Sequence, residues 1–303
     1  MTASATHAVL VGATATGKSA LALALARRDP TWELVSIDSM QVYRGMDIGT
    51  AKPTSDEQAE VPHHLIDLLD PWEDGSVAWF QQEAIAAVAE IERRGRRALL
   101  VGGTGLYVQA IVDDLDIPGQ FTAVRERLDA DPDTAALYGQ LHSLDPLAAS
   151  RIEPGNRRRI VRALEVCLGS GRPFSSFGPG LDAHPPTRFT MVGLGRHATD
   201  TRARIEARYA QQLADGFLAE VSRLLAHPRG MSRTAGQALA YRELTAHLAG
   251  ELTIDEAGAL AVSRTARFAR RQRAWFQRDP RIAWLDATRE DNLLVDALAA
   301  AVG

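Results

Sequence analysis

Short apolar segments alternate with helical patterns along the first third of the chain. Buried strands are predicted at residues 7–11, 33–37 and 97–101. Helices are predicted at residues 19–27, at about 78–94 and from Leu106 onward. Strands that alternate with helices in this way favour a parallel sheet with helices on both faces, which is an α/β fold.

The segment at residues 118–186 has a different character. It contains helical patterns but no convincing strand, and prolines bracket it at both ends. We interpret it as a helical insertion domain of roughly 70 residues within a core domain formed by residues 1–117 and 187–303. In the second part of the core, strands are predicted at 189–194 and 282–285 and arginine-rich helices at about 200–226 and 254–278.

The composition is that of a globular protein with a sizeable core: 303 residues, of which 46% are hydrophobic and 24% charged. The net charge of −4 does not indicate nucleic acid, although a local basic surface is enough to bind a phosphate backbone. The single cysteine, Cys167, excludes an internal disulfide and a multi-cysteine metal site. No signal peptide and no membrane span are expected, so the predicted location is the cytoplasm.

Residues 12–19 match the pattern G-x-x-x-x-G-K-[ST] between a predicted strand and a predicted helix. The matching residues are Gly12, Ala13, Thr14, Ala15, Thr16, Gly17, Lys18 and Ser19. Backbone N–H groups in such a loop, at the positive end of a helix, form a phosphate cradle. Lys18 is one of only two lysines among 34 basic residues. The other 32 are arginines, so a lysine at this position suggests that a narrow side chain has to reach a phosphate from inside the loop. The motif indicates a diphosphate or triphosphate ligand but does not identify it as ATP.

Two further strand ends carry candidate residues, because ligands of open α/β sheets bind beyond the carboxyl ends of the strands. Asp38 ends the second strand and is followed by Ser39, Met40 and Gln41. In a phosphotransferase such an aspartate would hold magnesium or act as a base, whereas in a structural role it would cap a turn. Thr104 follows the third strand, and its glycine neighbours allow close approach of a ligand.

The loop at residues 45–53 is a further candidate because it contains Lys52, the other lysine. His63 and His64 lack partners at a spacing typical of metal ligands, so we interpret them as structural.

Arginine clusters occur at residues 157–162, 202–208 and 270–273. Such clusters usually form the solvated face of a helix. Arg204 and Arg208, however, are four residues apart and share one helical face, as a clamp for a diphosphate requires. The third cluster continues to Arg278 and is interleaved with aromatic side chains, a combination that suits phosphates and unstacked bases.

Several of these segments together resemble the bacterial tRNA dimethylallyltransferase family. The run at residues 38–53 carries the most specific similarity, and the segments at 12–19, 101–107, 156–166 and 270–272 are also similar. The resemblance extends from about residue 7 to residue 286. One departure is Ala240, which stands where the family usually has glycine, and the local backbone geometry there is open.

The resemblance implies a P-loop NTPase-like fold and the transfer of a dimethylallyl group from dimethylallyl diphosphate to the exocyclic N6 amine of an adenosine. That adenosine is the one immediately 3′ of the anticodon in tRNAs that read codons starting with U. The implied partners are dimethylallyl diphosphate and the anticodon stem-loop of tRNA, the implied cofactor is Mg²⁺, and a monomer is expected.

The resemblance also implies roles for individual residues. Lys18 would grip the diphosphate with Ser19, which would also bind Mg²⁺, and Arg204 and Arg208 would add a second contact. Asp38 would accept a hydrogen bond or proton from the attacking amine, and Thr104 would lie near the tRNA. The other implied tRNA contacts are Ser39, Met40, Gln41, Arg125, Arg158, Arg159, Ile160, Val161, Arg162, Arg270, Arg271, Gln272 and Arg273.

Three other functions use the same residues. A small-molecule kinase would bind ATP at the cradle, but it does not need so many arginines in the insertion. A transferase that prenylates free adenine nucleotides would not need the insertion either. A nucleotide-regulated RNA-binding module would bind tRNA without group transfer.

Overall fold

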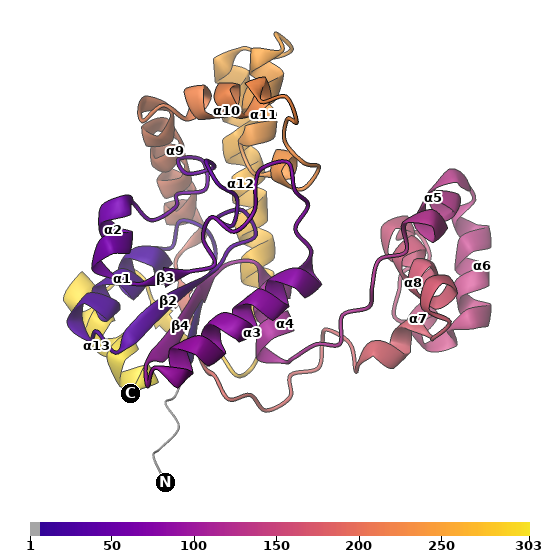
Figure 1. The fold of residues 1–303 in the computed structure, drawn as a ribbon, viewed down its shortest axis with the longest axis horizontal. Coiled ribbons are helices and arrows are strands. Elements are labelled where there is room, and N and C mark those ends of the chain that lie inside the picture. Colours follow the sequence, from indigo (N-terminus) through magenta and orange to yellow (C-terminus); the bar gives the residue numbers. More distant parts are fainter. Residues whose placement is uncertain (1–6) are drawn as a thin grey trace. The chain divides into compact units, whose positions relative to one another are not determined.

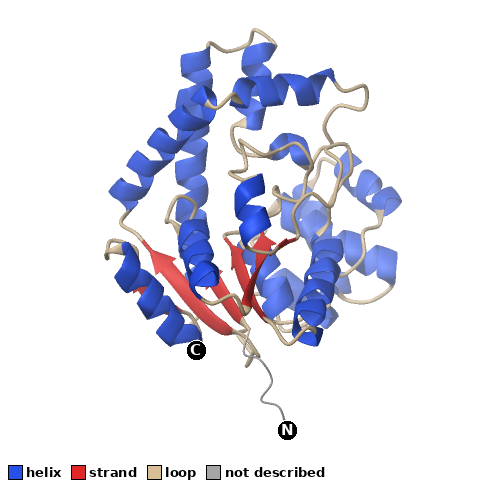
Figure 2. Ribbon diagram, turned by 60° about the vertical axis from the view of Figure 1, so that its left-hand side comes forward, coloured by secondary structure: helices blue, strands red, loops and turns tan. Residues whose placement is uncertain are grey.

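The computed structural model describes residues 7–303 (Figure 1). Its larger unit is built on one six-stranded sheet. The strands are β1 (Ala8–Val11), β2 (Trp32–Ile37), β3 (His63–His64), β4 (Arg97–Gly102), β5 (Thr190–Gly195) and β6 (Ala283–Asp286). Their order is β3-β2-β4-β1-β5-β6, and every neighbouring pair is parallel. Figure 2 shows helices on both sides of this sheet, so the predicted α/β architecture is confirmed.

Nine helices of the described residues belong to the core unit. They are α1 (Lys18–Arg28), α2 (Ser55–Glu60), α3 (Val77–Arg93), α4 (Gly105–Val112), α9 (Ala198–Ala214), α10 (Phe217–Ala226), α11 (Tyr241–Leu248), α12 (Ile254–Phe276) and α13 (Asp291–Val302). A short 3₁₀ helix, η2, covers Ala235–Gln237.

The sheet is buried on both faces, as all-parallel sheets are. Every residue of β1 and β2 is buried. On one face Ala8 and Leu10 pack with apolar residues of α1 and α13, and on the other Val9 and Val11 pack with residues of α3 and α4. Alternate strand residues therefore serve two separate cores, which explains why the strand segments read as continuous apolar runs.

The predicted helix at about 200–226 is wrong in one respect, because the chain forms two helices there. Gly216 lies between α9 and α10 and adopts a left-handed conformation with φ of 101°. Apolar and basic positions continue with helical spacing across this glycine, so the pattern alone does not reveal the break. Four other elements of the core unit, β3, α2, α11 and α13, were not predicted. For β3 and α2 the reason is physical, because β3 has only two residues and α2 buries none of its residues.

Residues 113–185 form a second compact unit, while residues 1–112 and 186–303 form the first. This unit begins about five residues before the predicted domain at 118–186 and ends at Pro185, one of the prolines that suggested the boundary. The helices of this unit are α5 (Thr122–Ala130), α6 (Thr134–Leu144), α7 (Pro146–Ser150), α8 (Arg157–Ser170) and the 3₁₀ helix η1 (Phe174–Phe177). It has a hydrophobic core of its own, in which Leu141, Ile160, Leu164 and the free thiol of Cys167 are buried.

The loop after β2 is docked onto the C-terminal helices by one buried carboxylate. Glu220 on α10 is 4% exposed. Its Oε2 accepts the N–H groups of Asp47 and Ile48 at 2.9 and 2.8 Å, and its Oε1 accepts that of Gly49 at 3.2 Å. The Tyr241 hydroxyl donates to the same Oε1 at 2.6 Å. A buried charge with four donors is satisfied, and it fixes the loop in place.

We predict that Glu220→Ala destabilises the core unit by about 3–5 kcal/mol, because three N–H groups and one hydroxyl lose their acceptor. All five tryptophans lie in the core unit, so urea unfolding followed by tryptophan fluorescence reports on it. Glu206→Ala is the matched control, since Glu206 forms an exposed ion pair with Arg202, and it should change stability by less than about 1 kcal/mol. Equal losses in the two variants would contradict the anchoring role.

Candidate active site at the carboxyl edge of the sheet

The phosphate cradle at residues 12–19 has the conformation that its sequence predicts. Gly12 and Gly17 adopt φ values of 155° and 104°, and α1 begins directly after Gly17. A Cβ at Gly12 would lie 2.6 Å from the carbonyl oxygen of Leu194, so only glycine fits there. The Thr16 hydroxyl donates to the carbonyl of Ala13 at 2.9 Å and holds the turn closed. The result is a glycine-rich turn that leads into the N-terminus of a helix, which is the geometry of an anion site.

Lys18 folds back over this loop. Its Nζ donates to the carbonyl oxygen of Ala13 at 2.8 Å. Burial lowers the pKa of Lys18 to about 8; Arg208 contributes to the decrease, and Asp38 opposes it. A cation that is poorly solvated gains much from an incoming anion, so this side chain suits a phosphate ligand.

The two arginines of α9 reach the same loop, as their spacing predicts. Arg208 donates from Nη2 to the Thr14 hydroxyl at 3.0 Å, and Arg204 donates from Nε to the carbonyl of Ala15 at 2.9 Å. Burial lowers the pKa of Arg208, the charge of Arg204 adds to this effect, and Asp38 opposes it. The structure therefore brings Lys18 and both arginines together at the cradle.

Asp38 follows β2 at the same edge of the sheet. Its Oδ1 accepts the N–H of Met40 at 2.8 Å, so it caps its own turn. Burial raises the pKa of Asp38; backbone N–H groups of Met40 and Gln41 and the charges of Lys18 and Arg208 oppose the increase. Asp38 can cap the turn and also act on a ligand, because the bond to Met40 uses only Oδ1.

The residues after Asp38 differ in what they offer to a ligand. Ser39 and Met40 are partly exposed. Gln41 is 9% exposed, accepts from the Ser36 hydroxyl at 2.7 Å, and donates to the carbonyls of Thr50 and Ala51. The Gln41 amide therefore holds its own loop together, which leaves Ser39 and Met40 as the accessible side chains of the turn.

Lys52 has a structural role, in contrast to Lys18. Its side chain is 3% exposed and forms ion pairs with Asp47 and Asp67 at 2.5 and 2.6 Å. Its Nζ also donates to the carbonyl of Tyr43 at 2.8 Å. These contacts close the loop at residues 45–53 through Asp47 and tie it to Tyr43 and Asp67. His64, in β3, bonds to Glu33 and is structural as well.

Thr104 lies in the loop at residues 102–105, which follows β4. The register pairs Gly102 with both Val11 of β1 and Ile37 of β2, so this loop is adjacent to the cradle and to Asp38. A Cβ at Gly102 would lie 2.3 Å from the carbonyl oxygen of Ile37. Thr104 itself is partly exposed, which allows its hydroxyl to face a ligand.

Tyr107 was not singled out from the sequence, yet it belongs to this site. Burial raises its pKa to about 12, and the neighbouring Tyr43 and Asp38 add to the increase. Its ring packs on Phe80 with centroids 4.8 Å apart. The only signal in the sequence is a tyrosine one turn after a glycine-rich strand end, and this signal does not distinguish a site residue from a core residue.

The four residues at 270–273 point in different directions. Arg270 and Arg271 are exposed, and Arg273 is partly exposed. Gln272 is 7% exposed and faces the sheet edge, where its Oε1 accepts the N–H of Thr14 and its Nε2 donates to the carbonyl of Gly103, both at 2.8 Å. The arginines are accessible to RNA, whereas the amide of Gln272 is committed to the protein.

In the unit formed by residues 113–185, the predicted RNA contacts differ in exposure. Arg158 and Arg159 are exposed at the start of α8. Ile160 and Val161 are at most 1% exposed and lie in the core of the unit, so the expectation that their side chains contact RNA needs correction: they supply packing. The remaining two, Arg125 and Arg162, form ion pairs with the buried Glu165 at 3.4 and 2.8 Å.

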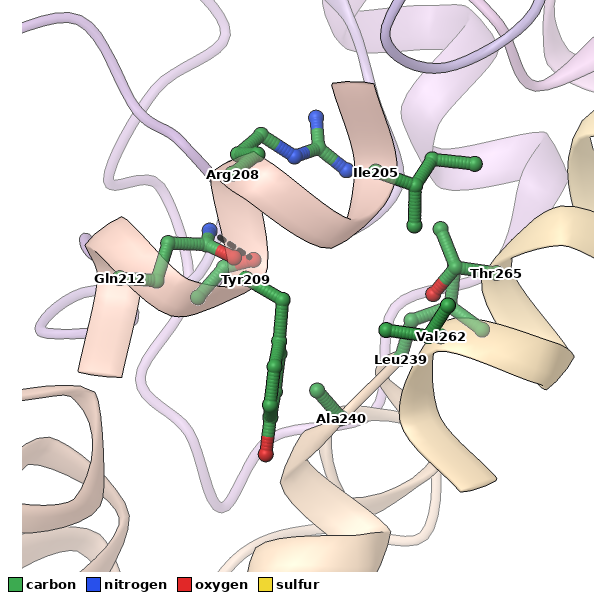
Figure 3. A pocket seen from close by; sticks show the side chains of 9 residues that line it. Ile205, Arg208, Tyr209, Gln212, Leu239, Ala240, Val262 and Thr265 are labelled. Carbon is green, nitrogen blue, oxygen red and sulfur yellow. Dashed lines mark hydrogen bonds between the residues drawn. The ribbon is translucent and has the colours of Figure 1, made fainter. Parts of the chain in front are cut away.

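A small pocket lies between α9 and α12 (Figure 3). Arg208, Tyr209, Val262 and Thr265 line it, and Ala240 contributes its methyl group. Ala240 has φ of 69°, so it keeps the left-handed geometry that glycine adopts without strain. Relative to glycine, alanine in this left-handed conformation costs about 1–2 kcal/mol.

The residues of the cradle fit a magnesium ion that is bound through phosphate. No group of three or more histidine, cysteine, aspartate or glutamate side chains suited to a metal occurs within residues 7–303. Mg²⁺, however, commonly binds through one or two protein ligands together with substrate phosphates and water. The exposed Ser19 hydroxyl, in the first turn of α1, is a ligand of that kind.

Over the part of the chain that the structure describes, no helix is long and apolar enough to cross a membrane.

Comparisons with known proteins identify relatives over most of the chain. The family model for IPP transferase matches residues 41–279. A tRNA dimethylallyltransferase from Nocardioides sp. is 48% identical over 296 residues, which is 97% of this chain and 94% of that protein. One from Corynebacterium efficiens is 48% identical over 286 residues, covering 93% of this chain and 95% of that protein.

Solved structures are similar over almost the whole chain. A full-length tRNA isopentenylpyrophosphate transferase from Bacillus halodurans has a TM-score of 0.70 and 35% identity, covering 97% of this chain and 96% of that one. A eukaryotic dimethylallyltransferase acting on tRNA has a TM-score of 0.79 and 25% identity, covering 94% of this chain and 74% of that one. The resemblance seen in the sequence is confirmed, and the chain belongs to the IPP transferase family.

Proposed function

We propose that the protein transfers a dimethylallyl group from dimethylallyl diphosphate to the N6 amine of the adenosine immediately 3′ of the anticodon in tRNA, with release of diphosphate. The observation that carries this proposal is the arrangement at the sheet edge. Two cations at the phosphate cradle, Lys18 and Arg208, lie within electrostatic reach of Asp38, a partly buried carboxylate. The names of the relatives, which are tRNA dimethylallyltransferases, support the same reaction.

The cradle would stabilise the leaving group. In the structure Lys18, Arg204 and Arg208 donate to oxygen atoms of the loop itself. On binding, these donors would turn to the oxygens of the diphosphate. Negative charge grows there as the bond between the allylic carbon and oxygen breaks, and preorganised donors stabilise that charge most strongly in the transition state.

Asp38 would receive the proton of the amine. The new bond joins N6 to the allylic carbon, the carbon–oxygen bond breaks with its electron pair on the diphosphate, and the proton leaves N6 for the carboxylate. An adenine amine is a poor nucleophile, so a positioned base and a close approach of the reacting atoms are both needed. The raised pKa of Asp38 makes it a better base than an exposed aspartate.

We propose Mg²⁺ as the cofactor, held by the Ser19 hydroxyl and the diphosphate. When bound, it would neutralise part of the charge of the leaving group. Lys18 would contact the diphosphate through its ammonium group.

The adenosine has to leave its stack to reach Asp38, which costs a few kcal/mol that RNA contacts must supply. Ser39, Met40 and Thr104 are the accessible side chains beside the site. The exposed arginines at 158, 159, 270 and 271 suit the phosphates of the anticodon stem-loop. We place this reaction in the cytoplasm, where the lone cysteine stays reduced, and we propose that the protein acts as a monomer.

The decisive experiment incubates the protein with unmodified tRNA, dimethylallyl diphosphate and Mg²⁺, then digests the RNA and weighs the nucleosides. Adenosine with an added dimethylallyl group is expected only when the diphosphate is present. A parallel reaction with ATP in its place tests for a kinase. Consumption of ATP while the anticodon-loop adenosine stays unmodified would refute the proposal.

We predict that Asp38→Ala lowers the transfer rate at saturating substrates by about 10²–10⁴-fold, because the amine loses its proton acceptor. The affinity for tRNA should change little, which a filter-binding assay measures. Asp56→Ala is the matched control, because Asp56 is an exposed aspartate in the first turn of α2. Normal turnover in Asp38→Ala would show that the carboxylate takes no part in the reaction.

A bell-shaped pH profile of kcat/KM for dimethylallyl diphosphate is expected. On the alkaline side the value should fall above about pH 8, as Lys18 of the free enzyme loses its proton. On the acid side kcat/KM should fall as Asp38 takes up a proton. This fall should occur at a pH above the ordinary aspartate pKa of about 3.9, because the pKa of Asp38 is raised. Lys18→Arg should move the alkaline limb upward, since a guanidinium keeps its proton. An unchanged alkaline limb in that variant would assign it to another group.

The affinity for tRNA should fall steeply with salt despite the net charge of −4. Each phosphate contact contributes a slope of about −0.7 to −0.9 in a plot of log K against log salt concentration. Arg271→Ala should therefore make the slope shallower by about one contact. Arg93→Ala should leave it unchanged, since Arg93 pairs with Glu90 on the surface of α3. Equal slopes for wild type and Arg271→Ala would show that Arg271 does not contact a phosphate of the RNA.

A further inference from the structure

One face of α12 runs along the edge of the active site. Ala266 and Ala269 belong to the apolar cluster that includes Ala13 of the cradle. Gln272, about one turn further, contacts the cradle and the loop at residues 102–105. Trp275 follows, and a Cβ at Gly105 would lie 2.4 Å from its ring. The helix therefore contacts, in succession, the two loops between which the reaction would take place.

The side-chain amide of Gln272 joins these loops directly. Its Oε1 accepts the N–H of Thr14 at 2.8 Å, and its Nε2 donates to the carbonyl of Gly103 at 2.8 Å. A backbone N–H only donates and a carbonyl only accepts, so the two partners define the orientation of the amide. Because the amide is planar and rigid, these two bonds fix the separation between Thr14 and Gly103.

The two residues that it joins belong to different halves of the site. Thr14 is also held by Arg208, which donates to its hydroxyl, so it lies on the diphosphate side. Gly103 directly precedes Thr104, the residue on the nucleotide side. Gly103 is itself adapted to the contact, because a Cβ there would lie 2.4 Å from Gln272 Nε2. The bridge thus needs both the glutamine and the glycine.

We propose that Gln272 is a positioning residue that sets the distance between the phosphate cradle and the Thr104 loop, and so between the allylic carbon and the attacking amine. This role rests on the proposed transferase function. The arginines around Gln272 suggested an RNA contact from the sequence, but the residue is 7% exposed and both polar atoms of its side chain are engaged within the protein. Gln272 acts on the reaction through the two loops and touches neither substrate.

Two variants separate this role from an RNA contact. Gln272→Met keeps the volume and removes both hydrogen bonds. Gln272→Glu keeps the shape and can still accept from Thr14, but its ionised carboxylate opposes the carbonyl of Gly103. When that carboxyl is protonated it can donate to the carbonyl again, so the bridge is restored at low pH.

The single-turnover rate of transfer, at saturating dimethylallyl diphosphate and tRNA, should fall by about 10- to 100-fold in Gln272→Met, since small displacements of reacting groups have effects of this size. The KM for dimethylallyl diphosphate and the Kd for tRNA should each stay within about 3-fold of wild type. In Gln272→Glu the rate relative to wild type should rise as the pH falls. Gln277→Met is the matched control, because it makes the same change at an exposed position near the end of α12 and should behave as wild type.

Tryptophan fluorescence establishes that each variant is folded before its rate is compared. If Gln272→Met does not fold, the pH dependence of the rate of Gln272→Glu distinguishes the positioning role from a purely structural one. A loss of tRNA affinity with a normal single-turnover rate would overturn the proposal in favour of an RNA contact. A normal rate with reduced stability, or a relative rate of Gln272→Glu that does not vary with pH, would overturn it in favour of a purely structural role. Inactivity of the wild-type protein in the same assay would instead refute the transferase function.

Discussion

The register of three neighbouring parallel strands is the constraint on which the site depends. Val11 of β1 and Ile37 of β2 both pair with Gly102 of β4, so the loops after these strands begin at the same level. The cradle, Asp38 and Thr104 follow within a few residues and share one edge of the sheet. Burial at this edge lowers the pKa of Lys18 and raises that of Asp38, while the attraction between the two charges opposes both shifts.

The strands alone do not hold these loops in position, because loops carry backbone polar groups that need partners. Side chains from the C-terminal helices supply them. Arg208 and Gln272 bond to the cradle, and Gln272 also bonds to the loop after β4. In the loop after β2, the carboxylate of Glu220 accepts three N–H groups. The second half of the chain thus forms the scaffold that fixes loops of the first half, with α9, α10 and α12 each responsible for particular contacts.

The arginines of this chain fall into two physical classes that composition does not separate. Some are engaged within the fold: Arg208 bonds to the cradle, and Arg125 and Arg162 compensate the buried Glu165. Others, such as Arg158 and Arg271, are exposed and available to an RNA backbone. An acidic protein can therefore present basic surfaces, because a large share of its cations and anions neutralise each other locally.

Features that depend on local pattern could be predicted from the amino-acid sequence: the strands with their continuous apolar runs, the cradle with its glycines and lysine, and Asp38 at a strand end. The sequence did not determine features without a local signal. The break at Gly216 interrupts a helical periodicity that continues on both sides, and β3 is too short to have a pattern. Gln272 lies in an arginine-rich run that suggested RNA, yet it faces inward and bonds to Thr14, 258 residues away in the chain. Only the tertiary structure decides such roles, because a side chain's partners across the fold are set by how the helices pack on the sheet.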